Sequence, residues 1–504
     1  MALMTMIITI LSSTAAIPTY AQIGRGTSTL QPTAIMDVAD ESLVFLGLPY
    51  ENNQTEADVY ILYSSENQEK KITHPLVIVE GFFPNFLTRI GLYNPIRAEV
   101  LTSVRPVFPE MDLIYVAWRD AEAPIESNSE TLKVILLWLQ EVLSQNQSNE
   151  RITLIGHSMG GLVGRWTLTQ MEEKQIPHGV GCYVSYDTPH LGAHFPLGLA
   201  YGVQGAAKLG STKEQFVKHL PSAELYILNQ LGSTMHSASA EQMVIQNVLS
   251  NGIIDNTKHN TWLKKLNDAG LPKGDMGYSM QCFAISNSDN KEHAALKEPY
   301  IDMNFEARSD FIGLFGGIWD FSAAISTGIL LSDAKAAILS ILPGRTKIQG
   351  KVYCAPGATH NDEITKLEVK LEKKLFYFIP INYTIYSYQQ KHPKNVPSYD
   401  YYPSSFWPMG GIRTTDENNK LPIFRDFKYK IESTMAMPFI PEISALAITS
   451  ASSPDSSEKQ KEESLFGKNT YISSEPLNHN VLSIEALNWL KDRAFSVEPE
   501  SVQQ

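Results

Sequence analysis

The chain has few cysteines and no excess of basic residues. Its 504 residues include three cysteines, Cys182, Cys282 and Cys354, whose spacing fits neither a zinc motif nor a disulfide framework. The odd number leaves at least one thiol unpaired, and the apolar stretches around Cys182 and Cys282 predict small buried hydrophobic side chains. The formal net charge of −13 argues against a nucleic-acid-binding protein and against a generally basic membrane-docking surface.

Uninterrupted hydrophobic runs of membrane-spanning length are also lacking. The most apolar segment, residues 311–331, has Asp320 at its centre and is broken by four glycines. It predicts a buried or lid-like helical hairpin rather than a membrane span. Hydrophobic residues nevertheless make up 43% of the chain and charged residues 19%, so a sizeable core can form. The length allows two to four domains of about 100–200 residues, or one α/β domain with large insertions.

The N-terminus has the pattern of a secretory signal peptide, without the usual basic residues at its start. Residues 3–11 are apolar, and a region of small residues follows that ends at Ala21. This order predicts cleavage after Ala21 and removal of residues 1–21. We therefore expect a protein that is secreted, periplasmic or held at the cell surface.

The most informative motif is Gly-x-Ser-x-Gly at residues 156–160. An apolar strand pattern precedes it at 152–155, and apolar residues at helical spacing follow it. A sharp turn between strand and helix lifts the Ser158 hydroxyl clear of the sheet, and Gly156 and Gly160 let the two elements approach closely. The helix N-terminus then directs unpaired N–H groups toward a forming oxyanion. The pattern predicts that Ser158 is a nucleophile.

Strands and helices alternate between residues 58 and 190. Continuous apolar runs predict buried strands, and the spacing of apolar residues over 129–144 predicts a helix. Such alternation predicts an α/β fold with a mostly parallel sheet that helices cover on both faces. The strands are expected at residues 59–63, 75–79, 113–117, 152–155 and 182–186.

After Gly192 the alternation stops, and the remainder divides into insertions. Helical patterns come first, an isolated apolar strand follows, and strong apolar–polar alternation appears over residues 347–390. A stretch rich in Ser, Glu and Lys at 451–468 predicts a mobile loop. The expected parts after the signal peptide are 22–194 (N-terminal part of the core), 195–280 (a helical lid or cap insertion), 281–290 (a core strand), 291–345 (an apolar helical insertion), 346–411 (an antiparallel β insertion) and 412–504 (the C-terminal part of the core).

A serine nucleophile needs a base that takes its proton and an acid that orients the base. Enzymes built on this turn carry the three groups in the order Ser, acid, His, with the histidine late in the chain. His479 is the only histidine after residue 400 and precedes the last predicted helix, so it is the candidate base. The acid is either Asp187, which ends the strand after the nucleophile helix and is favoured, or Asp289, which ends the next strand.

Two backbone N–H groups are expected to form an oxyanion hole. One is the amide of Met159, directly after the nucleophile. The other is the amide of Phe82, in the loop after the strand at 75–79. Glu80 in the same loop stands where hydrolases often have a histidine.

Several other histidines lie near these motifs. His157, His190 and His194 do not have the spacing of metal ligands, and the polar stretch 360–363 is more typical of an exposed loop than of a metal site. The acyl-enzyme chemistry of a serine nucleophile requires neither a metal nor an organic cofactor. We therefore expect no metal and no cofactor.

Five segments together form a recognisable set: 156–165, 171–172, 187–193, 195–198 and 439–446. They resemble the α/β-hydrolase lipases and esterases, in which a nucleophile elbow precedes a Pro-His-x-Gly-[Ala/Ser] turn, and more closely the bacterial secreted lipase-like proteins. The resemblance is specific over residues 74–200 and patchy beyond. It implies an α/β-hydrolase fold with Ser158 and His479 as catalytic residues, and Asp187 in the place of the acid of pancreatic-type lipases. In one departure, Met437 stands where many lipases carry the aspartate of Asp-Gly-x-Val-Pro.

These features together predict a secreted serine hydrolase that cleaves carboxylic esters of acyl lipids through an acyl-enzyme. Residues 195–345 would form a lid and an acyl pocket. Two alternatives stay open: a peptidase, amidase or acyltransferase with the same three residues, or an inactive hydrolase-fold binding protein, which Glu80 and the ambiguous acid favour slightly. The expected partners are a small-molecule or lipid ester and, transiently, a membrane or lipid surface, but no nucleic acid. Acyl length and oligomeric state are left open by the sequence.

Overall fold

The computed structural model describes residues 35–89, 93–212, 230, 232–275, 277–289, 299–311, 344–357, 359–375, 378–394, 396–397, 403–408, 413–421, 424–434, 436–449 and 463–495. The predicted signal peptide, nearly all of the predicted apolar hairpin and most of the predicted mobile loop lie outside these residues. The described strands form three sheets, of eight, six and two strands.

The eight-stranded sheet has the expected α/β organisation. Its order is β1-β2-β4-β3-β5-β6-β7-β16, and the six strands from β4 onward run parallel, whereas β1 and β2 are antiparallel to their neighbours. Strands β3, β4 and β5 are buried at every position, because both faces of the sheet are covered. The strands span Glu41–Leu46 (β1), Glu56–Leu62 (β2), Pro75–Val79 (β3), Asp112–Trp118 (β4), Ile152–His157 (β5), Val180–Tyr186 (β6), Gln281–Ser286 (β7) and Thr470–Ile472 (β16).

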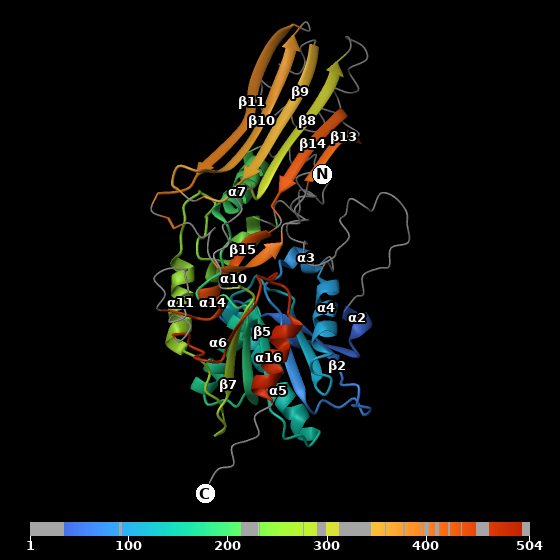
Figure 1. Cartoon of the computed structure of the whole chain (residues 1–504), viewed down its shortest axis with the longest axis vertical. Helices are drawn as coiled ribbons and strands as arrows, with labels where there is room; N and C mark the ends of the chain where they lie inside the picture. The colour runs from blue at the N-terminus through green and yellow to red at the C-terminus, as the bar shows by residue number, and fades with distance from the viewer. Residues whose placement is uncertain are drawn as a thin grey trace.

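Helices pack on both faces of this sheet (Figure 1). The apolar cluster on one face includes side chains of α4 (Asn94–Val104) and α16 (Ile484–Ala494). The cluster on the other face includes side chains of α5 (Ile125–Gln145) and α6 (Met159–Glu173). Successive residues of β3 alternate between the two clusters, as the pleat of a strand requires. The predicted helix over 129–144 is confirmed as the main part of α5.

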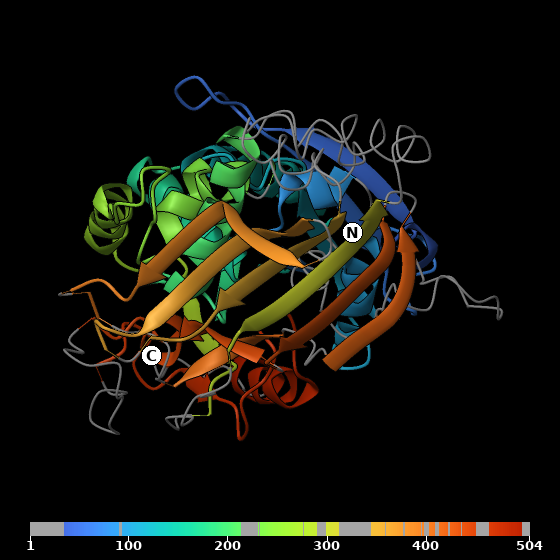
Figure 2. The same cartoon turned by 90° about the horizontal axis from the view of Figure 1, so that it is seen from above.

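The six-stranded sheet is antiparallel and is inserted between β7 and β16. Its order is β11-β10-β9-β8-β14-β13. Figure 1 shows it extending away from the eight-stranded sheet, and Figure 2 shows its strands side by side above the rest of the chain. We call it the inserted sheet. Its strands span Ile301–Phe311 (β8), Gly344–Cys354 (β9), Glu363–Leu375 (β10), Ile379–Lys391 (β11), Arg413–Leu421 (β13) and Phe424–Ser433 (β14).

This sheet is larger than the sequence predicted, and two expected boundaries are wrong. Strand β8 lies in the segment 291–345, which was expected to be helical. At the start of β8 buried residues alternate with more exposed ones, and the strand pairs with both β9 and β14. This alternation is typical of a strand, whereas the helical prediction relied on the apolar composition of the whole segment. Strands β13 and β14 lie in the segment 412–504, which was assigned to the core. They belong to the inserted sheet because β14 pairs with β8.

Three smaller parts complete the described structure around the two large sheets. Helix α7 (Leu197–Thr212) packs against β9, β10 and β11 of the inserted sheet. The two-stranded sheet consists of β12 (Ser404–Pro408) and β15 (Ala436–Pro441). Helices α10 (Ala238–Met243) and α11 (Thr257–Ala269) also fall in the segment predicted to be a helical cap. Figure 1 shows α7 and β15 between the two large sheets.

The three cysteines are free thiols. Cys182 is buried, as expected, and so is Cys354, whereas Cys282 is only half-buried. Burial raises the pKa of the Cys282 thiol to about 12, so it is protonated at neutral pH.

Within the described residues, no helix is both long enough and apolar enough to cross a bilayer. Three short helices also lie in the part of the chain that the structure describes: α2 (Ile35–Val38), α3 (Asn85–Arg89) and α14 (Glu442–Ala445).

Candidate active site

Ser158 stands at a strained turn between β5 and α6. Its backbone has φ 54° and ψ −125°, a combination that a non-glycine residue adopts at a cost. The turn is tight enough that a Cβ added to Gly160 would lie 2.2 Å from the carbonyl oxygen of Val79, and one added to Gly156 would lie 2.4 Å from Cα of Gly161. Both glycines of the motif are therefore required for the nucleophile helix to approach the sheet.

The structure brings Ser158, His479 and Asp187 together above the carboxyl ends of the parallel strands. Ser158 Oγ lies 2.8 Å from His479 Nε2, and His479 Nδ1 lies 2.6 Å from Asp187 Oδ2. With the proton on Nδ1, the imidazole donates to the carboxylate and accepts from the serine hydroxyl, which is the tautomer that a general base needs. The three side chains are 6%, 2% and 0% exposed. Asp187, rather than Asp289, is therefore the acid that orients the histidine.

The loop that carries His479 is held in place by the two-stranded sheet of β12 and β15, called the small sheet below, and by aromatic side chains. The backbone N–H of His479 donates to the carbonyl of Phe406 at the edge of β12 (2.8 Å). The ring of Phe439 meets the imidazole edge-on at 4.9 Å between centroids, and Trp407 lies 6.5 Å from it. These contacts shield the imidazole from water.

The predicted oxyanion loop lies directly against the nucleophile. A Cβ added to Gly81 would lie 2.8 Å from Ser158 Cβ. Within the described residues, the backbone N–H groups of Phe82 and Met159 meet no hydrogen-bond acceptor. They are therefore available to an oxygen that develops charge beside Ser158.

Glu80 and Arg97 form a buried ion pair beneath this loop. Arg97 donates to both carboxylate oxygens of Glu80 at 2.8 Å, and the backbone N–H of Trp118 and the hydroxyl of Tyr115 donate to the same carboxylate. The carbonyl of Glu80 accepts from the indole N–H of Trp118 (3.0 Å). Burial raises the pKa of Glu80, while Arg97 favours the charged form. Glu80 thus anchors the start of the oxyanion loop, and its place in the loop is structural.

The strand order, the turn at Ser158 and the position of His479 after the last strand are those of one superfamily. The chain is an α/β-hydrolase by fold. Residues 69–234 match a protein family described as "Putative serine esterase (DUF676)". This match contains the nucleophile motif, Asp187 and the predicted oxyanion loop. No match to the chain is found among curated proteins.

Several solved esterases show a distant structural likeness to the chain. Est1E from Butyrivibrio proteoclasticus shares 9% identity over 29% of this chain and 51% of its own, with a TM-score of 0.21. An esterase of Pyrobaculum calidifontis shares 14% identity over 31% of this chain and 47% of its own, with a TM-score of 0.23. The carboxylesterase EstE1, cloned from a metagenomic library, shares 14% identity over 49% of this chain and 69% of its own, with a TM-score of 0.26. The matches span about half the length of the first two proteins, and at these TM-scores they add nothing to the argument from topology.

Two residues that sequence analysis did not assign to the site hold the loop of His479 in place. His157, next to the nucleophile, donates from Nε2 to the carbonyl of His479 (2.7 Å). Burial, together with the nearby His479, lowers the pKa of His157 to about 4, so the ring is neutral at pH 7. Asn287, directly after β7, donates from Nδ2 to carbonyls on both sides of His479. His157 occupies the variable position before Ser158 in the Gly-x-Ser-x-Gly motif, and Asn287 lies two residues before Asp289, the alternative acid.

The other two histidines named above, His190 and His194, have structural roles. His190 is buried between the hydroxyl of Ser185 (2.7 Å) and the guanidinium of Arg165 (3.2 Å). The backbone N–H of His194 donates to the carbonyl of Phe439 (2.8 Å). Within the part of the chain that the structure describes, no three His, Cys, Asp or Glu side chains are grouped as metal ligands.

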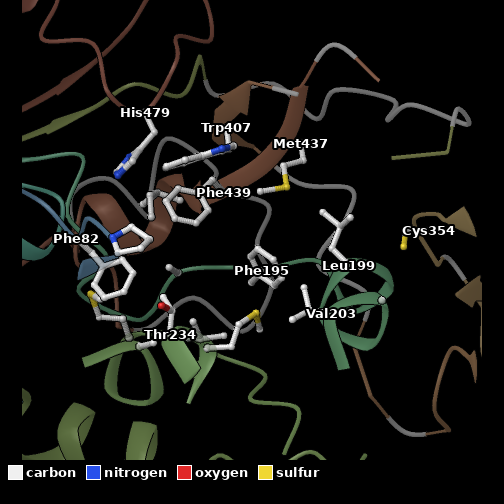
Figure 3. Close-up of a pocket in the computed structure, with 18 of the residues that line it drawn as sticks. Phe82, Phe195, Leu199, Val203, Thr234, Cys354, Trp407, Met437, Phe439 and His479 are labelled. Carbon is white, nitrogen blue, oxygen red and sulfur yellow. The ribbon is translucent and has the colours of Figure 1, made fainter. Parts of the chain in front are cut away.

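A cavity of about 200 Å³ opens beside Ser158 and His479. It is much larger than the ~15 Å³ that a single water molecule needs. Phe82 of the oxyanion loop and Trp407 and Phe439 of the small sheet line it near the imidazole (Figure 3). Among the described residues, no Asp, Glu, Lys or Arg lines it. The cavity therefore suits an apolar, uncharged group next to the nucleophile.

Proposed function

We propose that the protein is a serine hydrolase that cleaves carboxylic esters of acyl lipids. The observation that carries the proposal is the continuous chain of hydrogen bonds from Asp187 through His479 to Ser158, which ends at an apolar cavity. A hydroxyl that donates to an imidazole nitrogen is an activated nucleophile, and an apolar wall beside it binds the hydrocarbon of an acyl group.

In the proposed reaction, Ser158 Oγ attacks the ester carbonyl while its proton moves to His479 Nε2. The carbonyl oxygen becomes negatively charged and is stabilised by the N–H groups of Phe82 and Met159. The carbon–oxygen bond to the alcohol breaks, and His479 donates its proton to the departing alcohol oxygen. A water molecule then gives a proton to His479 while its oxygen attacks the acyl carbon. The bond between that carbon and Ser158 Oγ breaks, His479 returns the proton to Oγ, and the carboxylic acid leaves. Asp187 stabilises the positively charged imidazole during both halves.

Export to the periplasm, cell surface or medium is part of the proposal and is supported by the sequence of residues 1–21 alone. The full chain, expressed in a bacterium and recovered from the exported fraction, should begin at Gln22 by N-terminal sequencing. Recovery only from the cytoplasm with residues 1–21 intact would contradict this part. Contact with a lipid surface follows from the proposed substrate, and flotation with phospholipid vesicles measures it.

The experiment that tests the function uses a fluorophosphonate probe, which modifies activated serines. Wild-type protein should be labelled, and the Ser158→Ala variant should not. The same preparations are then assayed with p-nitrophenyl esters and with peptide p-nitroanilides, and ester cleavage should predominate. A folded wild type that the probe does not label would contradict a hydrolase and favour a binding protein. Labelling with cleavage of anilides alone would replace the esterase by an amidase.

A further inference from the structure

The cavity beside Ser158 reaches beyond the core of the hydrolase. Four of its lining residues lie on α7, and they are Leu199, Gly202, Val203 and Ala206. Their spacing of three, one and three residues places them on one face of the helix. Leu199 and Ala206 are seven residues apart, which corresponds to about 10 Å along the helix axis. The cavity therefore extends well past the space needed at the nucleophile itself.

A further wall of the cavity comes from the inserted sheet. The residues are Ile301 of β8, Val352 and Cys354 of β9, and Leu367 of β10. All four belong to one apolar cluster with Leu199. Helix α7 lies so close to this wall that a Cβ added to Gly202 would lie 2.7 Å from Cys354 Sγ. The inserted sheet and α7 thus form one packed unit around this part of the cavity.

Figure 3 shows how the two regions are arranged. His479 and Phe82 lie at one end of the cavity, and Cys354 lies at the other, with Leu199 and Val203 near it. The nucleophile is therefore at one end of an apolar channel, and the contact between α7 and the inserted sheet closes the other end.

We propose that this far end sets the length of the acyl chain, so that the inserted sheet acts as the specificity-determining wall of the esterase. The inference rests on the proposed function and deepens it by naming the substrate class, esters of medium- to long-chain fatty acids. The ester carbonyl sits at Ser158 and the hydrocarbon runs along the face of α7 toward Cys354.

The chemistry of the wall favours a hydrocarbon over any polar ligand. The residues of the far end are aliphatic or glycine, apart from one thiol, and that thiol is protonated because Cys354 is buried and its pKa is raised to about 12. Each methylene that moves from water into such a wall should raise kcat/KM about fourfold until the channel is filled. Longer chains should gain nothing more, or should be rejected.

A matched pair of variants on α7 tests the inference. Ala206 lines the cavity, whereas Ala207, the next residue, is exposed to solvent. Ala206→Trp fills the far end, and Ala207→Trp adds the same ring outside. Hydrolysis of p-nitrophenyl butanoate and dodecanoate is measured for both variants and for wild type. Labelling with a short-chain fluorophosphonate, scored on the same samples, reports that the protein is folded and that Ser158 is activated.

Wild type should prefer dodecanoate. Ala206→Trp should lower kcat/KM for dodecanoate by about 100-fold and leave butanoate within about twofold, because only chains that reach the far end lose their site. Ala207→Trp should leave both unchanged. A wild type that prefers butanoate, or an Ala206→Trp variant that lowers both esters equally while it is still labelled at the wild-type rate, would overturn the inference and leave the esterase intact.

Failure of the proposed function gives a different result, since wild type then cleaves neither ester and is not labelled. If Ala206→Trp does not fold, Val203→Phe replaces it, because Val203 lines the same channel. A thermal unfolding transition and probe labelling establish that this variant is folded. It should show the same selective loss on dodecanoate, and an unchanged ratio of the two esters would overturn the inference.

Discussion

Asn287 is bonded both to Asp187 and to the loop that carries His479. Its backbone N–H donates to Asp187 Oδ1 at 3.1 Å. Its side-chain Nδ2 donates to the carbonyls of Asn478 and Val481, each at 3.0 Å. One buried residue after β7 therefore sets the position of the acid relative to the base, although the two lie 292 positions apart in the chain.

Asn287→Leu should lower kcat and leave KM nearly unchanged. Leucine has a similar volume but donates no hydrogen bond, so the loop loses two bonds and the imidazole loses its alignment with Ser158. We expect kcat for a short ester to fall by about 10- to 100-fold, in line with the cost of a small displacement in a catalytic site. The rate of fluorophosphonate labelling should fall in parallel, because it depends on the same activated serine.

The matched control for this variant is Asn247→Leu. Asn247 is also buried, and its Nδ2 also donates to two backbone carbonyls at 3.0 Å, those of Glu241 and Val244 at the end of α10. Both variants should lose about 2 kcal/mol of stability in urea unfolding, since each leaves two carbonyls unpaired. Only Asn287→Leu should reduce kcat strongly. Equal kcat values in the two variants would show that Asn287 matters for stability alone.

Asp187→Asn should nearly abolish turnover while the protein stays folded. The amide can donate to His479 Nδ1 and so stabilise the wrong tautomer, in which Nε2 carries the proton and cannot accept one from Ser158. We expect kcat to fall by about 10³- to 10⁴-fold. Asp289→Asn is the control, because the structure pairs the histidine with Asp187. Steady-state rates on one short ester compare the two variants, and a larger loss in Asp289→Asn would refute the assignment of the acid.

The sequence predicted Ser158, His479 and Asp187 because each is marked by its neighbours. The serine lies in a glycine turn, and the aspartate and histidine follow or precede elements whose apolar periodicity can be seen locally. The parallel sheet was predictable for the same reason. His157 and Asn287 carry no such mark, because their roles arise from contacts with a loop about 200 or more positions away, which periodicity does not report.

The full extent of the inserted sheet could not be predicted from the local sequence pattern either. Residues 413–421 are mostly polar and show no apolar alternation, yet they form β13 because they pair with β14. Strand β14 in turn is placed by β8, more than 100 residues earlier. A strand whose position depends on a partner this distant in sequence is specified by tertiary pairing rather than by its own residues.

Glu80→Gln should destabilise the fold far more than removal of an exposed charge. It leaves the buried guanidinium of Arg97 without its carboxylate, which costs about 3–5 kcal/mol. Glu56→Gln removes a partner of Arg119 at the surface and should cost less than about 1 kcal/mol. Urea unfolding of both variants measures the difference. The double variant Glu80→Gln/Arg97→Met should recover most of the loss, because no unpaired charge is left, and similar losses in the two single variants would contradict a buried pair.

Acid should destabilise the folded protein through its buried histidines before most carboxylates are protonated. Burial lowers the pKa of His157 to about 4 and that of His190 well below its ordinary value of 6.5. Between pH 6.5 and 4 the unfolded chain therefore binds protons that the folded chain does not. The contribution of these histidines to the free energy of unfolding is fully present above pH 6.5. It falls as the pH decreases through this window, by up to about 1.4 kcal/mol per pH unit for each such histidine.

His157→Gln separates this effect from other titrating groups. Glutamine can still donate to the carbonyl of His479, but it has no proton to bind near pH 5. Urea unfolding at intervals from pH 4 to 7 should show a steep decline for wild type and a shallower one for the variant. The two curves should diverge by about 3 kcal/mol at pH 4, which corresponds to the shift of the His157 pKa. Parallel curves would mean that His157 is protonated in the folded protein, and its bond to the His479 carbonyl would then have to be maintained by a charged ring.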